Sequence, residues 1–367
     1  MPTGCCRNVT RRDRLRGFLP MIIREKEPAN LEMPFGELDG FITPNDQFYI
    51  RSHFPVPAAD LGTWRLKVEG AIEHSREWSI DELRSLPIKT IPATLECAGN
   101  GRVFLVPKVK GAQWELGAIG NAEWTGISLG DLLQKSGVKS DAVDVILEGA
   151  DNGSIAEPPK PAGKIHFARS VPLGKALDDV LLAFEMNRVP LTPPHGFPLR
   201  AIVPGWYGMA AIKWLHRIVV TDRPYNGYYQ TVDYGFWEKG SNGPTLVPIT
   251  EMQVKSSIAR PGINEVISAG TNYRVKGAAW TANADIVQVE LSTDGGKTWR
   301  PTSLGKEKAR NCWQLWECDW ETSRAPGRCI LLARATDSRG RTQPLERDLD
   351  RGTYEINHCL PIEVEIR

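Results

Sequence analysis

A single cysteine, Cys97, lies where an apolar stretch meets a run of small residues. The segment LECAGNGR (residues 95–102) places two glycines and Arg102 directly after the thiol. Small residues let a large ligand approach the backbone closely. A neighbouring cation favours the thiolate, which is a good ligand for a soft metal. The segment therefore suits metal ligation, although a buried free cysteine is the commoner role of such a residue.

A second candidate is DQFYIRSHF (residues 46–54), which alternates like a strand. As a strand it presents Tyr49, Arg51 and His53 on one face, opposite an apolar face that carries Phe48, Ile50, Ser52 and Phe54. This arrangement suits the binding of an anion. The alternative is an amphipathic strand whose polar face is solvated, and both interpretations stay open.

A third candidate combines HGFPLR (residues 195–200) with VPGWYGMAAIKW (residues 203–214). Glycines and prolines shape a loop at the end of a strand, and His195, Arg200 and Lys213 bring donors towards it. Free backbone N–H groups in such a loop suit a phosphate or a pterin. The alternative is a turn that carries surface basic residues.

Other chemistries find no support in the sequence. It has no G-x-S-x-G elbow, no H-E-x-x-H and no phosphate-binding glycine loop. The formal net charge of +1 supplies no overall field for nucleic acid or membrane. The seven cysteines form no C-x-x-C pair, which indicates free thiols in a reducing compartment. With no long apolar run, we expect a cytoplasmic protein without a membrane segment.

The 367 residues predict two domains. Residues 1–243, which include an N-terminal arm over 1–30, mix strands and helices without a regular βαβ period, so we expect an α+β domain. The expected strands are 46–54, 64–72, 90–97, 143–149 and 198–205, and the expected helices are 79–87, 128–137 and 175–187.

A polar, glycine-rich segment, EKGSNGP (residues 238–244), is expected to be a linker to the second domain. Residues 244–367 show short alternating strands separated by turns, which predicts an all-β sandwich of immunoglobulin-like size. Asp294-Gly295-Gly296 is expected to turn between two of these strands. Cys312, Trp316, Cys318 and Trp320 are expected to share the core-facing side of a strand.

Six segments occur in an order that resembles the sulfite oxidase family of molybdopterin enzymes. They are PNDQFYIRSH (44–53), LECAGNGR (95–102), KGAQWELGAIGNAEW (110–124), HGFPLR (195–200), VPGWYGMAAIKWL (203–215) and QTVDYGF (230–236). The C-terminal part resembles the dimerisation domain of that family, so the resemblance covers nearly the whole chain.

The resemblance implies a molybdenum bound by one pyranopterin dithiolene and by the Cys97 thiolate. The sequence contains no C-x-x-C-H and no recognisable haem-binding module, so we expect no haem. It implies cofactor contacts from Tyr49, Ile50, Arg51, Ser52, His53, Cys97, Asp151, His195, Arg200, Ala211, Ile212 and Lys213. It implies an oxyanion pocket formed by Arg51, Arg102, Trp114, Tyr234 and Arg351, with Tyr228 and Tyr229 as alternatives to Tyr234. Converging guanidinium groups bind tetrahedral oxyanions through forked hydrogen bonds.

The implied reaction is oxidation of sulfite to sulfate by oxygen-atom transfer. Electrons would pass to an external acceptor, a cytochrome or dioxygen, and the enzyme would be a homodimer. One alternative keeps the cofactor and acts on nitrate or a sulfoxide. Another alternative, from a different class, is an interaction protein that uses its immunoglobulin-like domain.

Overall fold

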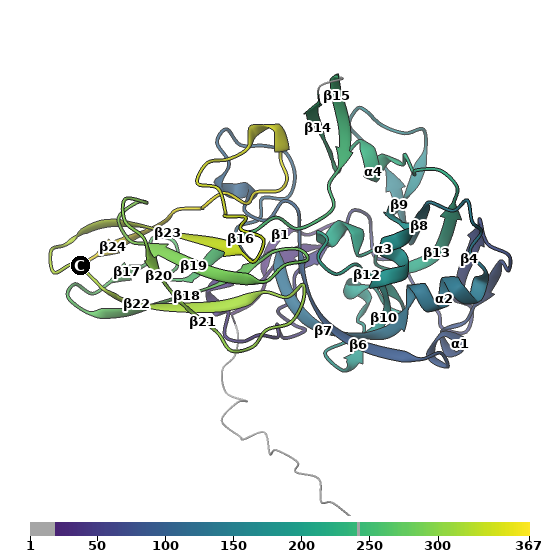
Figure 1. The fold of residues 1–367 in the computed structure, drawn as a ribbon, viewed down its shortest axis with the longest axis horizontal. Coiled ribbons are helices and arrows are strands. Elements are labelled where there is room, and N and C mark those ends of the chain that lie inside the picture. Colours follow the sequence, from purple (N-terminus) through teal and green to yellow (C-terminus); the bar gives the residue numbers. More distant parts are fainter. Residues whose placement is uncertain (1–18, 241–242) are drawn as a thin grey trace, which may run out of the picture.

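The structure, a computed structural model, describes residues 19–240 and 243–367. Its two lobes lie side by side, and the strands of the C-terminal part of the chain form one of them (Figure 1). Part of the predicted N-terminal arm, residues 1–18, lies outside the described residues. Within these ranges no helix has both the length and the hydropathy needed to cross a bilayer.

Apart from the hairpin of residues 235–248, the described residues of the first lobe form three sheets. The five-stranded antiparallel sheet consists of β6 (Ile88–Glu96), β7 (Ile119–Ser128), β10 (Leu181–Met186), β11 (Val189–Pro190) and β12 (Arg200–Ile202). The five-stranded mixed sheet has the order β5 (Arg76–Trp78), β4 (Leu66–Gly70), β13 (Leu215–Thr221), β8 (Asp144–Ser154) and β9 (Lys164–Pro172). The small sheet consists of β1 (Ile22–Glu25), β2 (Asn30–Glu32) and β3 (Ile50–Arg51).

The helices are short and connect these strands. They are α1 (Ile80–Arg84), α2 (Leu129–Ser136), α3 (Leu173–Asp178) and α4 (Tyr228–Thr231), with the 3-10 turns η2 (Phe35–Glu37), η3 (Arg102–Phe104), η4 (Pro193–His195), η5 (Gly208–Ala210) and η6 (Leu349–Arg351). The predictions of α1 and α2 are confirmed. Ser79 and Glu82 form a capping box at α1, and Gly137 ends α2 with φ 70°.

The prediction of a helix over residues 175–187 is wrong in its second half. The helix α3 ends at Asp178, and residues 181–186 form the strand β10 instead. This strand lies between β7 and β12 and is almost entirely buried, so its run of apolar residues fits a strand covered on both faces. Short apolar runs of this kind do not distinguish a buried strand from a helix.

The second lobe contains two sheets that enclose a shared core. One has the order β16 (Lys255–Arg260), β18 (Asn272–Trp280), β22 (Gln314–Glu321) and β21 (Ser303–Leu304). The other has the order β17 (Val266–Ile267), β24 (Ile362–Ile366), β23 (Gly327–Asp337), β19 (Ile286–Ser292) and β20 (Arg300–Pro301). Among the described strands of this lobe, β17 pairs with β24 in parallel and the other pairs are antiparallel.

Two predictions for this lobe are confirmed. Trp316 and Trp320 are buried on one side of β22, with Cys318 half-buried between them, and Cys312 is buried just before the strand. Asp294 lies in the turn between β19 and β20, where its carboxylate accepts hydrogen bonds from the backbone N–H groups of Lys297 and Thr298. These bonds hold the turn closed.

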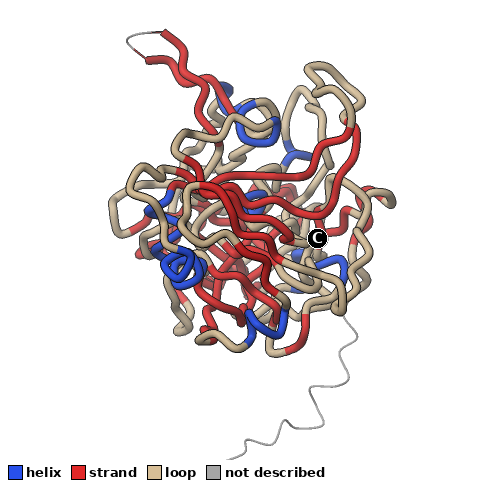
Figure 2. Tube along the Cα trace, turned by 90° about the vertical axis from the view of Figure 1, so that its right-hand side faces the viewer, coloured by secondary structure: helices blue, strands red, loops and turns tan. Residues whose placement is uncertain are grey.

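The predicted linker over residues 238–244 is wrong as a description of the local structure. The described residues of this segment belong to a hairpin of β14 (Gly235–Gly240) and β15 (Gly243–Pro248) that rises away from the body of the protein (Figure 2). The division into domains at 243/244 therefore stays a prediction.

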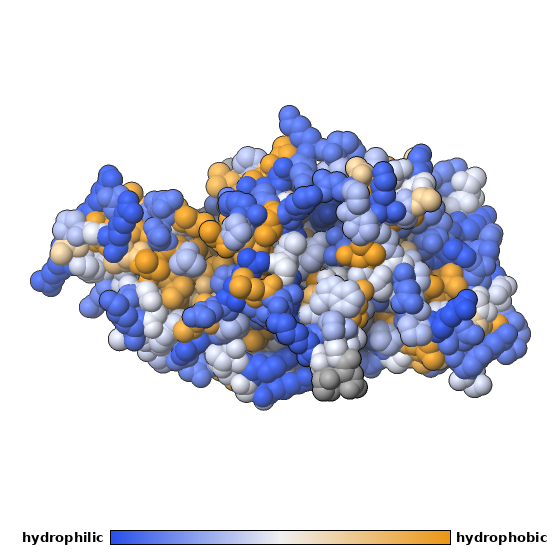
Figure 3. All heavy atoms as spheres, turned by 90° about the horizontal axis from the view of Figure 1, so that it is seen from above, coloured by the Kyte–Doolittle hydropathy of each residue, from blue (hydrophilic) through white to orange (hydrophobic). Residues whose placement is uncertain are grey.

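Hydrophilic residues cover much of one face of the molecule, and apolar residues form scattered patches on it (Figure 3).

Candidate functional site

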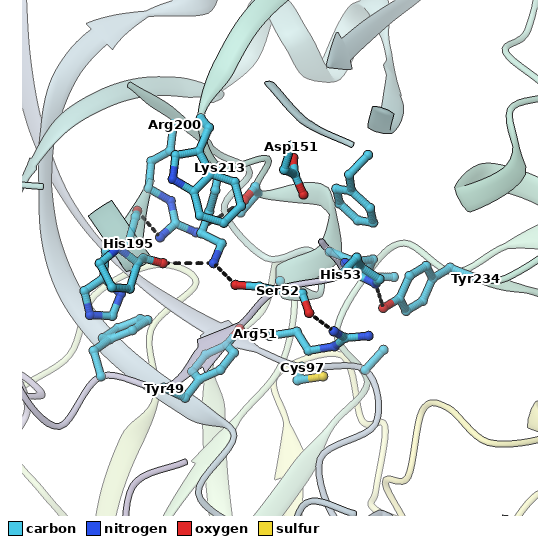
Figure 4. A pocket seen from close by; sticks show the side chains of 18 residues that line it. Tyr49, Arg51, Ser52, His53, Cys97, Asp151, His195, Arg200, Lys213 and Tyr234 are labelled. Carbon is cyan, nitrogen blue, oxygen red and sulfur yellow. Dashed lines mark hydrogen bonds between the residues drawn. The ribbon is translucent and has the colours of Figure 1, made fainter. Parts of the chain in front are cut away.

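A cavity in the first lobe gathers residues that are far apart in the sequence. Figure 4 shows its lining. The lining residues are Phe48, Tyr49, Arg51, Ser52, His53, Cys97, Ala98, Asp151, Phe167, Pro194, His195, Arg200, Gly208, Met209, Ala211, Lys213, Trp214 and Tyr234. Eleven of the residues named from the sequence are thus in one place: Tyr49, Arg51, Ser52, His53, Cys97, Asp151, His195, Arg200, Ala211, Lys213 and Tyr234.

Cys97 enters the cavity at the end of the long strand β6. Its N–H donates to the carbonyl of Ala118 at 2.9 Å, and its carbonyl accepts from the N–H of Asn100 at 2.8 Å. These bonds make a tight turn after the strand and leave the buried thiol at the cavity wall. The thiol is therefore held by backbone geometry rather than by a side-chain partner of its own.

The glycines after Cys97 make room for protein atoms. A Cβ at Gly99 would lie 2.2 Å from Nη2 of Arg102, because that guanidinium folds back over the turn. Gly101 has φ 99°, and a Cβ there would approach Leu360 and Ile356 of the C-terminal segment. Contacts with Arg102, Leu360 and Ile356 therefore account for these two glycines, without any need for them to make room for a ligand.

His53 and Tyr234 form a hydrogen bond near the thiol. Their Nε2 and Oη atoms lie 2.7 Å apart, and the His53 ring stacks on Phe167 with centroids 4.1 Å apart. Burial, followed by the charges of Arg51 and Lys213, lowers the pKa of His53 well below its usual value. Burial raises the pKa of Tyr234, against the opposing effect of Arg51. At neutral pH the imidazole is therefore uncharged and the phenol keeps its proton.

Arg51 brings a positive charge to the same part of the cavity. Its guanidinium donates to the carbonyl of Ser52 and, at 3.4 Å, to Oδ1 of Asn30. No ion pair joins Arg51 to a carboxylate within residues 19–240 and 243–367. The charge is therefore available to an anion that enters the cavity.

The opposite part of the cavity holds a cluster of basic residues. Nζ of Lys213 donates to Oγ of Ser52 at 3.0 Å and to the carbonyl of Pro194 at 2.8 Å. Arg200 donates to the carbonyls of His195 at 3.0 Å and Ala211 at 3.2 Å. These cations are thus held by neutral oxygens.

Burial lowers the pKa of each basic group in this cluster. The pKa of Lys213 falls well below its usual value, that of His195 to about 3 and that of Arg200 to about 10. Burial also raises the pKa of Asp151 to about 7. Among the described side chains, Nε of Arg200 and Oδ1 of Asp151 are buried without a hydrogen-bond partner. Because Nε of Arg200 is a buried donor without a partner beside the cavity, it favours the binding of an anion there.

Besides the alternative tyrosines Tyr228 and Tyr229, five of the residues named for the site do not line this cavity: Ile50, Arg102, Trp114, Ile212 and Arg351. Ile50 belongs to β3, while Trp114 and Ile212 are fully buried nearby. Arg102 is buried and donates to the carbonyl of Ala112 at 2.8 Å. Arg351 pairs with Glu355 at 2.6 Å and stacks on Phe236. Their proposed roles stay predictions.

Sequence reasoning missed part of the lining. Phe48, Ala98, Pro194, Gly208, Met209 and Trp214 lie inside or beside the segments that had been singled out. Phe167, on β9, belongs to no such segment, and β9 brings it to the cavity while paired with β8. Of the three candidate tyrosines, Tyr234 lines this cavity, whereas Tyr228 and Tyr229 line a neighbouring one.

Comparison with known proteins gives matches along both lobes. Residues 53–229 match the family described as "Oxidoreductase molybdopterin binding domain", and residues 247–351 match the "Mo-co oxidoreductase dimerisation domain". The sulfite oxidase of Gallus gallus is 36% identical over 343 residues, which cover 88% of this chain and 72% of that protein. Nitrate reductase [NADH] 1 of Oryza sativa subsp. japonica is 33% identical over 368 residues, which cover 89% of this chain and 39% of that protein.

The crystal structure of the sulfane dehydrogenase SoxCD from Paracoccus pantotrophus has the same fold. It is similar with a TM-score of 0.79 and 26% identity, over 94% of this chain and 86% of that one. The chain spans 58% of the length of the mitochondrial sulfite oxidase of Drosophila melanogaster, to which it is 36% identical over 87% of its own length.

Proposed function

The chain belongs to the sulfite oxidase family of molybdopterin oxidoreductases, and on that premise we propose that it oxidises sulfite to sulfate at a molybdenum held by Cys97. The observation that carries the proposal is the composition of one cavity. Its lining includes a thiol, an arginine without a carboxylate partner, and a hydrogen-bonded tyrosine, together with a separate basic cluster. We assign these groups as the metal ligand, the oxyanion site and the phosphate site that the proposed reaction requires.

The residues of the cavity fit a pterin cofactor that carries a phosphate. Lys213, Arg200 and His195 supply donors, and Nε of Arg200 is buried without a partner among the described side chains. Burial lowers the pKa values of Lys213, Arg200 and His195, and the negative charge of a bound phosphate would raise them again. Cys97 would bind the metal, and the cofactor, when bound, supplies oxygen-atom transfer and two-electron chemistry.

The protein groups around the thiol bind and orient the substrate. Arg51 can form two parallel hydrogen bonds to the oxygens of sulfite, which is anionic at neutral pH. The phenol of Tyr234 keeps its proton and hydrogen-bonds His53, so the pair can give or take a proton at the oxygen of Tyr234. Burial of the cavity strengthens both interactions by excluding water.

The second lobe supports a further part of the proposal. Its two packed sheets and its match to a dimerisation domain lead us to assign residues 244–367 as an immunoglobulin-like domain that forms a homodimer. Light scattering at micromolar concentration tests this assignment, and a monomer would contradict it. Electrons are proposed to pass to an external acceptor.

A second candidate function is nitrate reduction with the same cofactor, which the similarity to the rice nitrate reductase favours. The test uses purified protein of measured molybdenum content. Sulfite-dependent reduction of ferricyanide, cytochrome c and dioxygen is measured in parallel with nitrate-dependent oxidation of a reduced viologen. We expect sulfite turnover in proportion to molybdenum. Molybdenum-loaded protein that turns over nitrate alone would overturn sulfite oxidation, and protein without molybdenum would support an interaction module.

A further inference from the structure

We propose that Lys255 and Trp280, two residues of the second lobe, are positioning residues that fix the Cys97 turn by holding the carboxylate of Glu96. The proposal rests on the assignment of Cys97 as the metal ligand. It gives the second lobe a role at the catalytic centre in addition to the dimer contact.

Glu96 is the last residue of β6 and directly precedes Cys97, and its exposure is 1%. Nζ of Lys255 lies 2.8 Å from Oε1 of Glu96, and Nε1 of Trp280 donates to Oε2 at 2.8 Å. Each oxygen of the carboxylate therefore has its own donor from the second lobe. A carboxylate held at both oxygens cannot rotate, so the end of β6 is fixed relative to the second lobe.

The same lysine also contacts the turn itself. Nζ of Lys255 donates to the carbonyl of Asn100 at 2.9 Å, and Nδ2 of Asn100 donates to Oε1 of Glu96 at 3.2 Å. The N–H of Asn100 donates to the carbonyl of Cys97 at 2.8 Å. Lys255, Glu96 and Asn100 thus form a closed set of hydrogen bonds around the backbone of Cys97.

A second path ties Asn100 to the neighbouring strand. Oδ1 of Asn100 accepts from the N–H of Ala118 at 3.1 Å, and the carbonyl of Ala118 accepts from the N–H of Cys97 at 2.9 Å. The N–H of Glu355, from the C-terminal segment, donates to the carbonyl of Ala98 at 2.9 Å. These hydrogen bonds fix the backbone on both sides of Cys97 and therefore limit the directions in which its thiol can point.

Stability alone does not explain this arrangement. The side chain of Lys255 is 2% exposed and that of Glu96 is 1% exposed, so both charges are fully removed from water. Removing two charges from water offsets most of the attraction between them, and an apolar pair of similar volume often stabilises a fold as well. The ion pair instead fixes the orientation of the turn, because Lys255 donates to specific oxygens of Glu96 and Asn100 beside the thiol.

The test compares Lys255→Met, Trp280→Phe and the double variant Glu96→Gln/Lys255→Met with wild type. Arg334→Met is the matched control, since it removes a 2.7 Å ion pair with Glu290 in the same lobe, away from the turn. Three quantities are measured for each protein: molybdenum per subunit, the Mo(V) electron paramagnetic resonance spectrum after chemical reduction without sulfite, and kcat and KM for sulfite.

We expect Lys255→Met and the double variant to shift the Mo(V) spectrum and to lower kcat by about tenfold or more, because small displacements of reacting groups are costly. We expect KM to stay within about twofold, since Arg51 is untouched. Trp280→Phe removes one hydrogen bond without changing charge, so it tests the proposal even if Lys255→Met does not fold. We expect Arg334→Met to keep the wild-type spectrum.

Folded Trp280→Phe and double-variant proteins with the wild-type spectrum and kcat would overturn the positioning role. The Mo(V) spectrum is generated without sulfite, so this result does not depend on the substrate. A wild-type protein that holds molybdenum but does not oxidise sulfite would overturn the proposed substrate while leaving the positioning role to be judged from the spectra.

Discussion

Nε2 of His53 lies 2.7 Å from the phenol oxygen of Tyr234, although 181 residues separate them in the chain. His53 lies just after β3, and Tyr234 directly precedes the projecting hairpin. The fully buried guanidinium of Arg169 donates to the carbonyl of Tyr229 at 2.5 Å and to that of Tyr234 at 3.4 Å. The position of Tyr234 is thus set by β9 as well as by its own segment. Its bond to His53 and its place in the cavity lining favour Tyr234 among the three candidate tyrosines.

The first prediction concerns Tyr234→Phe. Loss of the hydroxyl removes a proton donor and leaves Nε2 of His53 without this partner, so we expect kcat to fall about 10- to 100-fold with unchanged molybdenum content. Steady-state kinetics with ferricyanide measure the effect. Tyr228→Phe is the control and should stay within about twofold of wild type. If Tyr228→Phe lost the activity instead, Tyr234 would be the wrong tyrosine.

The second prediction concerns Arg51→Gln. The variant loses the positive charge that faces the cavity, so we expect the KM for sulfite to rise about tenfold or more while molybdenum content stays near that of wild type. Arg188→Gln is the control, because Arg188 is exposed and pairs with Glu123 on the surface. Equal KM values in wild type and Arg51→Gln would remove Arg51 from the substrate site.

The third prediction concerns the pH dependence of stability in cofactor-free protein. Burial raises the pKa of Asp151 to about 7, so the folded state holds this proton more tightly than the unfolded state does. The resulting stabilisation is complete below about pH 4, the usual pKa of an aspartate, and is lost as pH rises towards 7. We therefore expect wild type to lose stability relative to Asp151→Asn between these values.

Urea unfolding of both cofactor-free proteins at pH 4, 5.5, 7 and 8 measures this difference. A difference in the free energy of unfolding that stays constant across the series would show that Asp151 has an ordinary pKa. His195 should act in the opposite direction. Burial lowers its pKa to about 3, so its contribution is present above about pH 6.5 and is lost as pH falls towards 3.

Local signals in the sequence predicted local structure well. The capping residues Ser79 and Ser128 fixed the starts of α1 and α2, and Gly137 fixed the end of α2. The strand β6 and the turn after it were also predictable, because an apolar run leads directly into small residues. In each case the determining residues lie within a few positions of the element.

Features that depend on distant partners were not predictable in this way. Residues 181–186 form a strand because β7 and β12 lie on either side of them, and the segment alone does not contain that information. The alternation expected over residues 46–54 is also wrong, since Phe48 and Ser52 line the same cavity as Arg51. Lys255 reaches Glu96 across 159 residues, which no local pattern reveals.

The central claim is that the sulfur of Cys97 is bonded to molybdenum, and Cys97→Ser tests it most directly. X-ray absorption at the molybdenum K-edge is measured on wild type and on the variant, with circular dichroism to show that the fold is kept. We predict that Cys97→Ser has one fewer sulfur neighbour at the metal, or loses the metal, and that sulfite turnover is abolished. An unchanged number of sulfur neighbours, together with wild-type turnover, would contradict the account.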